Sequence, residues 1–323
     1  MKSIVQETYG SADVLALRDI DRPEIGDDEV LVRVAAAGVD RGVWHLMVGL
    51  PYPIRLAGYG FRTPKRANPG MDVAGVVESV GKDVTRFAPG DEVFGIGRST
   101  FAEYAVAPEK KLVPKPAGLT FEQAAAVPIS GLTALQAVRD QARVEPGQKV
   151  LVIGASGGVG TYVVQLAKAF GAEVTGVSSS TKVDLVRSLG ADHVIDYTAE
   201  DFTEPEGEYD VIIDIGGNTK LARLRRTLSP TGTLVFVGGE TGGRWLGGMQ
   251  RQIGASLISM FARQNLKMFV NKENHEDMLA LTELIEAGKV TPSIERTYPL
   301  SEAAKAIRHM EEGHARGKLV ITV

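Results

Sequence analysis

The chain has 323 residues, of which 44% are hydrophobic and 24% charged, a composition typical of a soluble globular protein. The formal net charge is −4 and no basic run of the kind that follows a phosphate backbone is present, so we expect no nucleic-acid partner. The absence of cysteine excludes disulfides, thiolate catalysis and zinc sites with cysteine ligands.

The length and the N-terminus set further expectations. The chain is too long for one ordinary hydrophobic core, which predicts two domains. The opening residues, MKSIVQETYG, lack the apolar stretch of a signal peptide, and no segment approaches the ~18 apolar residues of a membrane span. We therefore expect a cytoplasmic protein with no membrane partner.

Short strands separated by turns are predicted for residues 1–125. The segments DEVLVRVAAAGV, MDVAGVVESVG and DEVFGIG are rich in β-branched residues, and proline and glycine separate them. Their spacing predicts a barrel-like β domain. A long irregular segment with aromatic residues, LPYPIRLAGYGFRTPKRANPG (50–70), lies between the first two strands. It is too long for a simple connector, which leaves two interpretations, a functional segment and a passive surface loop.

From residue 126 the pattern changes to alternating strands and helices. A helix is predicted for VPISGLTALQAVRDQARV, and apolar runs such as VLVI and VIIDI fit strands that are buried on both faces. Amphipathic segments such as GTYVVQLAKAFG separate these strands, which predicts a parallel, doubly wound α/β sheet. A helix, HEDMLALTELIEAG, and a short strand–helix–strand tail follow.

A glycine-rich loop, GASGGVG (154–160), joins the predicted strand KVLVI to a helix. A helix N-terminus offers free N–H groups and partial positive charge, and glycines allow a pyrophosphate to come close to them. The strand before the loop and the helix after it are the context that a dinucleotide-binding loop requires. The alternative interpretation is a tight structural turn.

The end of the second predicted strand bears on the choice of cofactor. Enzymes that use NAD usually place an acid there for the ribose 2′-hydroxyl, whereas this chain has SSSTK (178–182) and no acid before Asp184. Hydroxyl groups and Lys182 suit the 2′-phosphate of NADP(H). Lys182 as a solvated residue at the start of a helix is the alternative.

Several of these motifs, in order and spacing, resemble one known family. GASGGVG, GLTALQAV, RSLGADHVIDY and PGMDVAGVVESVG are similar to segments of the medium-chain dehydrogenases/reductases, in their zinc-free quinone oxidoreductase and enone reductase branch. The resemblance covers essentially the whole chain. It implies a GroES-like β-barrel domain (1–124 and 272–323), a Rossmann NADP-binding domain (125–271), and a homodimer.

The positions of the family's zinc ligands are occupied differently in this chain. Zinc-dependent relatives place a cysteine after A-A-G-V and a His-Glu pair after P-G, where this chain has Asp40, Met71 and Asp72. These side chains do not make a plausible set of three ligands with an open position. The resemblance therefore implies an enzyme without zinc.

The resemblance also implies cofactor-binding residues. The pyrophosphate loop would comprise Gly154, Ser156, Gly157, Gly158 and Val159, and the 2′-phosphate would meet Ser178, Lys182 and Tyr197. The nicotinamide half of the cofactor would lie beside a further set: Thr133, Ile215, Gly216, Gly238 and Gly239. Arg316 or Lys318 would add positive charge to the cofactor.

The substrate residues implied by the resemblance have structural alternatives. Tyr52 resembles a family tyrosine whose hydroxyl hydrogen-bonds a carbonyl or delivers a proton, and Asp40 occupies a position where zinc-free relatives usually have asparagine. Asp40 as a structural residue is the alternative. The side chains expected to line the substrate pocket are Trp44, Tyr59, Trp245 and Phe261, and ordinary packing is the alternative for each.

Together these features predict an NADPH-dependent, zinc-free reductase that transfers hydride to quinones or α,β-unsaturated carbonyl compounds. An activated acceptor already spreads the incoming charge, which explains how a metal can be dispensed with. Two other functions stay open: an NADP-dependent alcohol dehydrogenase or carbonyl reductase, and a non-catalytic NADPH-binding protein like the lens crystallins of this family.

Overall fold

The computed structural model describes residues 1–65, 67–204, 206–238, 243, 245, 247, 254–255, 259, 262–313 and 315–323. The chain divides into two compact units. The first comprises Met1–Leu132, Glu273–Glu286 and Pro292–Val323, and the second comprises Thr133–Lys272 and Ala287–Thr291. Compared with the domain bounds expected from the sequence, the first unit extends further along the chain, to Leu132.

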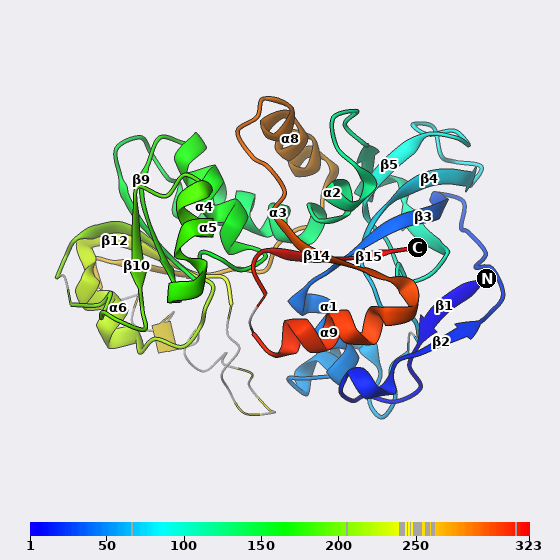
Figure 1. The fold of residues 1–323 in the computed structure, drawn as a ribbon, viewed down its shortest axis with the longest axis horizontal. Coiled ribbons are helices and arrows are strands. Elements are labelled where there is room, and N and C mark those ends of the chain that lie inside the picture. The colour runs from blue at the N-terminus through cyan, green and yellow to red at the C-terminus, as the bar shows by residue number, and fades with distance from the viewer. Residues whose placement is uncertain are drawn as a thin grey trace. The chain divides into compact units, whose positions relative to one another are not determined.

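A mixed seven-stranded sheet forms the centre of the first unit (Figure 1). The strands follow the order β14-β15-β3-β4-β5-β7, and β6 pairs with β3. The pairs are antiparallel except β14 with β15. The strand bounds are β3 Glu29–Val39, β4 Asp72–Val80, β5 Glu92–Ile96, β6 Tyr104–Pro108, β7 Leu112–Pro114, β14 Ile294–Pro299 and β15 Lys318–Thr322. A separate hairpin pairs β1 (Lys2–Val5) with β2 (Ala16–Asp19).

The helices of the first unit are α1 (Arg41–Val48), α2 (Phe121–Ala125), α8 (His275–Glu286) and α9 (Ala303–Glu311). Helix α1 begins after Asp40, whose carboxylate accepts the N–H of Val43, and ends at Gly49, where φ is +64° and the N–H donates to the His45 carbonyl. A left-handed glycine is a common helix stop. Helix α9 packs on β14 and β15, and its apolar face joins the core beside β3.

The second unit is the doubly wound domain that the sequence predicts. Its six strands are all parallel and follow the order β10-β9-β8-β11-β12-β13, the strand order of a dinucleotide-binding fold. The bounds are β8 Lys149–Ile153, β9 Glu173–Ser178, β10 His193–Asp196, β11 Tyr209–Asp214, β12 Leu228–Phe236 and β13 Asn265–Met268.

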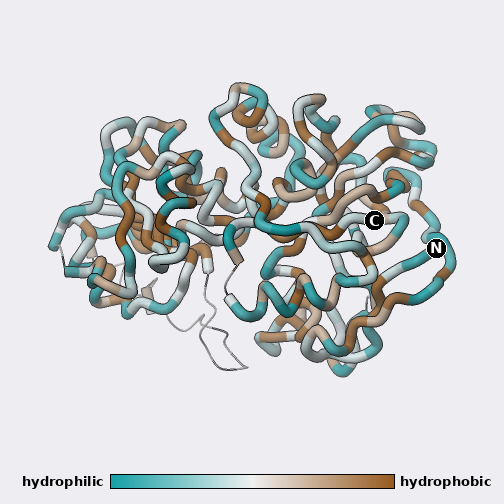
Figure 2. The backbone as a smooth tube through the Cα atoms, viewed as in Figure 1, coloured by the Kyte–Doolittle hydropathy of each residue, from teal (hydrophilic) through white to brown (hydrophobic). Residues whose placement is uncertain are grey.

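Helices of the second unit among the described residues include α4 (Gly160–Ala169), α5 (Val183–Ser188) and α6 (Leu221–Thr227). The helix predicted before β8 is present as α3 (Pro128–Gln136), which crosses the boundary between the units, followed by a π-helical turn (Ala137–Ala142). In Figure 2 hydrophobic stretches run through the interior of this unit, and the central residues of β8 and β11 are buried, as their apolar runs predict. None of the helices in the described part of the chain is long and apolar enough to cross a membrane.

Candidate functional site

The glycine-rich loop connects β8 to α4 and has the geometry of a cradle. Gly154, where β8 ends, has φ of +84°, and its carbonyl accepts the N–H of Gly157 at 3.1 Å. A Cβ on Gly160 would lie 2.1 Å from the carbonyl oxygen of Gly154, so only glycine fits there. No side chain caps the N-terminus of α4. The N–H groups of Thr161 and Tyr162 donate to the carbonyls of Gly157 and Val159, so an anion at this helix start would meet the partial positive charge of the helix and the N–H groups of the loop before them.

Three strand ends meet at this loop. The N–H groups of Ile215 and Gly216 both donate to the Ile153 carbonyl, at 3.0 and 3.2 Å, and Gly216 lies against Gly154. Gly238, which follows β12, lies so close to Ile215 that a Cβ would come within 2.2 Å of the Ile215 carbonyl. The structure therefore brings together predicted residues from three separate motifs at the carboxyl edge of the sheet, where such folds bind nucleotides.

The residues predicted for the 2′-phosphate lie at the neighbouring ends of β9 and β10. The Tyr197 N–H donates to the Ser178 carbonyl at 3.1 Å, and Lys182 ends a 3₁₀ turn (Ser180–Lys182) that precedes α5. The Tyr197 ring is exposed, whereas the side chain of Ser178 is only 2% exposed and its hydroxyl donates to the Ser179 carbonyl. The side chains of Lys182 and Tyr197 are thus better placed for a ligand than that of Ser178.

An acidic residue that the sequence interpretation missed also lies here. Asp196 pairs with Ser178 across the two strands and accepts hydrogen bonds from the N–H and hydroxyl of Thr198, at 2.9 and 2.7 Å. These hydrogen bonds lower the pKa of the Asp196 carboxyl. The acid belongs to the third strand of the predicted order, so a search at the end of the second strand alone passes over it.

For several other predicted residues the structure gives a location or an exposure but no contact that bears on a ligand. Thr133 lies on α3 at the start of the second unit, and Ser156 is buried within the glycine-rich loop. Trp245 is exposed. Gly239 and Phe261 lie outside the described residues.

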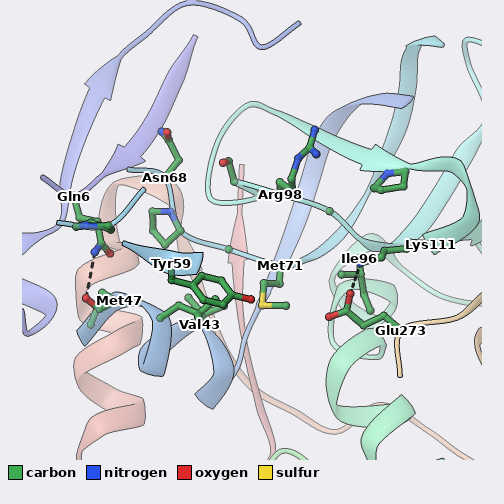
Figure 3. Close-up of a pocket in the computed structure, with 17 residues that line it drawn as sticks. Gln6, Val43, Met47, Tyr59, Asn68, Met71, Ile96, Arg98, Lys111 and Glu273 are labelled. Atoms are coloured by element: carbon green, nitrogen blue, oxygen red, sulfur yellow. Dashed lines mark hydrogen bonds and ion pairs between the residues drawn. The ribbon is translucent and has the colours of Figure 1, made fainter. Parts of the chain in front are cut away.

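A pocket of about 290 Å³ lies in the first unit, and Figure 3 shows its lining. Its walls come from α1, from the segments 68–71 and 96–99, and from Tyr59, which reaches across the pocket toward Met71. Charged side chains at one end are already paired: Arg98 with Glu29 at 2.7 Å, and Lys111 with Glu273. The pocket therefore offers a mixed polar and apolar lining in which these charged side chains are already paired.

The predicted pocket residue Tyr59 is held in place by its backbone. The phenol of Tyr9 donates to the carbonyls of Tyr59 and Gly60, at 2.8 and 2.7 Å, and the guanidinium of Arg55 stacks over the Tyr9 ring. Tyr52 is not among the pocket residues, and its ring lies 5.0 Å from the same guanidinium. The structure thus separates the two predicted tyrosines, with Tyr59 on the pocket and Tyr52 beside Arg55.

Trp44 also lies away from this pocket. Its indole N–H donates to the carboxylate of Glu311 at 2.6 Å, and its ring packs against the core of the first unit. This anchors α1 to α9 and corresponds to the packing alternative for Trp44.

A buried cluster of charges lies behind the pocket wall, because Asp72 directly follows the pocket residue Met71. The Asp72 carboxylate accepts the N–H of Ile129 at 3.0 Å and faces the ammonium of Lys318 at 3.3 Å. The neighbouring Asp40 is 6% exposed and its Oδ2 has no hydrogen-bond partner among the described residues. Burial raises the pKa of Asp72 to about 7, against the attraction of Lys318 and with a further upward contribution from Asp40.

Lys318, one of the two residues expected to add positive charge to the cofactor, is engaged in this buried cluster. Lys318 is 1% exposed, and its ammonium donates to the Ser130 hydroxyl at 3.1 Å as well as to Asp72. A lysine is buried to this extent only when it is paired. Asp40, likewise, acts as the N-cap of α1, which corresponds to its structural alternative. In the part of the chain that the structure describes, no three His, Asp or Glu side chains form a metal-binding group.

Two family models match the chain. Residues 26–117 match the alcohol dehydrogenase GroES-like domain, and residues 189–321 match a model described as zinc-binding dehydrogenase. Both matches agree with the fold, since the first falls in the β unit and the second includes strands of the parallel sheet.

Relatives cover nearly the whole chain. The 2-methylene-furan-3-one reductase of Solanum lycopersicum is 34% identical over 338 residues, 99% of this chain and 79% of that protein. The chloroplastic NADPH-dependent alkenal/one oxidoreductase of Arabidopsis thaliana is 34% identical over 99% of this chain and 79% of its own length. The solved structure of the quinone oxidoreductase from Coxiella burnetii has a TM-score of 0.86 and 31% identity, covering 100% of this chain and 99% of that one.

The chain therefore belongs to the medium-chain dehydrogenase/reductase family of oxidoreductases, as the sequence motifs predict.

Proposed function

We propose that this protein is an NADPH-dependent reductase of quinones or α,β-unsaturated carbonyl compounds that works without zinc. The observation that carries the proposal is the meeting of Gly154, Gly216 and Gly238 beside the uncapped start of α4. The names of relatives at 31–34% identity, a quinone oxidoreductase and two enone-type reductases, support the acceptor class.

The second unit's residues fit a dinucleotide. The glycines leave room for a pyrophosphate against the N–H groups of the loop, and the partial positive charge of α4 favours its negative charge. Lys182 and Tyr197, at the ends of β9 and β10, support NADPH over NADH because a cation and an exposed phenol suit a 2′-phosphate. When bound, NADPH supplies the hydride; the chain binds and orients it and excludes water.

The donor set supports a mechanism without zinc, although the matching family model is described as zinc-binding. Asp40 uses one oxygen to cap α1, and Asp72 is engaged by Lys318 and the Ile129 N–H. Met71 offers only a thioether. Zinc sites need three nitrogen, thiolate or carboxylate ligands with an open position, and this set does not fit one.

Tyr59 is the residue that we propose to contact the acceptor. Its phenol lies in the pocket, where it can donate a hydrogen bond to a carbonyl oxygen that gains negative charge. A quinone or enone delocalises that charge itself, so one well-placed hydroxyl suffices where a saturated ketone would need a stronger electrophile.

A cytoplasmic location and a homodimer are part of the proposal. The terminal strand β13 leaves Met268 and the following Val270 exposed, which supports pairing with a second copy at this edge. Light scattering coupled to size exclusion tests the dimer, and cell fractionation tests the location.

The reaction is tested by following NADPH absorbance with 1,4-benzoquinone, an enone, a saturated ketone and an aldehyde, after exhaustive chelation. We expect turnover with the first two. The same assays are run before chelation for comparison. Turnover of only the ketone or aldehyde, present before chelation and lost after it, would contradict the proposal and favour a metal-dependent alcohol dehydrogenase. Tight NADPH binding with no turnover of any acceptor would favour a non-catalytic binding protein.

A further inference from the structure

The irregular segment between β3 and β4 has an unusual distribution of charge. Although the chain as a whole is acidic, no Asp or Glu occurs between Arg41 and Met71. The same stretch holds Arg41, Arg55, Arg62, Lys65 and Arg66. We call residues 50–65 the pocket loop, because Tyr59 and Pro64 line the pocket of the first unit.

The pocket loop exposes large apolar side chains even though its backbone is anchored. Leu56 is 74% exposed and Phe61 is 70% exposed. Between them the loop is tied down, since Tyr9 holds the carbonyls of Tyr59 and Gly60 and the Lys65 N–H donates to Tyr59 at 2.8 Å. An anchored backbone holds two large apolar side chains in solvent, and such exposed side chains favour an apolar partner.

The basic side chains of the pocket loop differ in whether they have partners within the protein. Arg55 is used inside the loop, where its guanidinium donates to the carbonyls of Gly49 and Val48 and stacks on Tyr9. Arg62 and Lys65 are exposed and have no ion pair among the described residues. Most other exposed lysines and arginines in the first unit, such as Lys82 with Asp27, face an acid.

We propose that the pocket loop docks on the surface of an anionic lipid bilayer, with Leu56 and Phe61 in the interface and Arg62 and Lys65 at the headgroups. Apolar and aromatic side chains beside basic residues are the features of interfacial membrane binding. Anionic headgroups attract each lysine or arginine near the surface, and this attraction weakens within a Debye length as salt rises. A peripheral contact of this kind needs no membrane-spanning helix, and it departs from the expectation from the sequence that the protein has no membrane partner.

Docking would place the pocket next to the lipid phase, because Tyr59 and Pro64 belong to both the pocket and the loop. If the proposed reductase activity is correct, acceptors with long apolar tails could reach the pocket without leaving the bilayer. The docking itself does not depend on that activity, and the following experiments detect it without an assay of turnover.

Co-sedimentation of the full chain with vesicles tests the proposal. We expect binding to phosphatidylcholine vesicles that contain phosphatidylglycerol, little binding to pure phosphatidylcholine, and release as salt is raised. Phe61→Asp and Leu56→Asp should each lower the partition coefficient at least about tenfold, whereas Leu17→Asp, at a 40% exposed leucine on β2, should not. Thermal unfolding of each variant checks that it folds.

A charge-matched pair of variants separates local attraction from net charge. Arg62→Ser with Lys65→Ser should lower binding to anionic vesicles about tenfold. Lys82→Ser with Lys305→Ser removes the same formal charge from ion-paired positions and should leave binding unchanged. Equal losses in both double variants would overturn the proposal.

Depth quenching locates the contact. A tryptophan placed by Phe61→Trp should be quenched by lipids with brominated acyl chains, and one placed by Leu17→Trp should not. No binding of the wild type to anionic vesicles would overturn the proposal. A change of oligomeric state in Phe61→Asp without lipid would also overturn it, by assigning the surface to a second copy of the chain.

Discussion

The proposed nucleotide site of the second unit and the proposed acceptor pocket of the first are built in different ways. The proposed nucleotide site is made of backbone, because glycines at three strand ends let the backbone segments approach one another and keep side chains out of the site. The pocket is made of side chains from distant segments, among them Tyr59, Arg98 and Glu273. In a site made of backbone, an added side-chain atom blocks the ligand. In a site made of side chains, the removal of one functional group removes one contact with the ligand. Substitutions should therefore act differently in the two units.

The largest effect is expected at the buried charges behind the pocket. Lys318→Met leaves Asp72 without its cation, and breaking a buried pair in this way costs about 3–5 kcal/mol of unfolding free energy. Denaturant unfolding measures this, and Lys82→Met, at an exposed ion pair, should cost far less. The NADPH dissociation constant should stay unchanged, since Lys318 serves the first unit only. Weaker NADPH binding at full stability would instead restore its role at the cofactor.

In the glycine-rich loop two alanine variants should separate folding from binding. Gly160→Ala puts a Cβ against the Gly154 carbonyl at 2.1 Å, so both stability and NADPH affinity should fall. Gly157→Ala meets only an ordinary 3.5 Å contact, so its melting temperature should change little. Its NADPH affinity should nevertheless drop on the order of tenfold or more, because the added Cβ keeps the pyrophosphate from the backbone. Unchanged affinity in Gly157→Ala would indicate a structural turn.

At the far end of the nucleotide site Lys182 decides between cofactors. Lys182→Ala should weaken NADPH by about 1.5–3 kcal/mol, roughly ten- to a hundredfold, and leave NADH almost unchanged. Lys220→Ala, at an exposed lysine of the same unit, is the control. Isothermal titration at fixed ionic strength measures both cofactors. Should both weaken equally, Lys182 is only a residue at the start of a helix.

On the pocket side the two tyrosines make a direct comparison. Tyr59→Phe removes a hydrogen-bond donor to the charge that develops on the acceptor oxygen. The loss of transition-state stabilisation, about 1–3 kcal/mol, should lower kcat/KM and leave NADPH affinity unchanged. Tyr52→Phe should have little effect, because Tyr52 is not among the pocket residues. Steady-state kinetics with a quinone and an enone measure both variants. The reverse ranking would return the catalytic role to Tyr52, as the sequence alone predicts.

A further effect is the pH dependence of stability. The folded-state pKa of Asp72, about 7, lies above the ordinary 3.8, so its contribution to stability is fully present below pH 3.8 and is lost as pH rises through 7. Unfolding free energies between pH 5 and 8 should therefore fall less steeply in Asp72→Asn than in the wild type. Parallel profiles would show that Asp72 does not titrate in this range.

The sequence predicted the parts of the molecule that periodicity and glycine determine. The buried apolar runs of β8 and β11, the loop at Gly154 and the order of strands and helices follow from local pattern, so the α/β fold and the family are confirmed. Local pattern does not show which distant side chains meet. The pairing of Lys318 with Asp72 joins positions at opposite ends of the chain, and the anchoring of Trp44 by Glu311 does the same.

The pocket shows the same limit. The family resemblance favours Tyr52 as the catalytic tyrosine and gives Tyr59 only a place in the pocket lining, whereas in the structure Tyr59 lines the pocket and Tyr52 does not. Asp196 was missed because it lies eighteen positions after Ser178 in the chain, although the two residues are paired on neighbouring strands. Ser180 and Thr198, whose hydroxyl groups are hydrogen-bonded, are separated by the same number of positions.

The central claim, hydride transfer from NADPH to an activated acceptor, is tested most directly by isotope tracing. The chelated protein is given NADPH deuterated at the reactive C4 position and an α,β-unsaturated ketone, and the product is analysed by NMR and mass spectrometry. We predict a saturated ketone that carries one deuterium at the β-carbon. Deuterium at the carbonyl carbon of an allylic alcohol, or a reaction that occurs only when zinc is restored, would contradict this account.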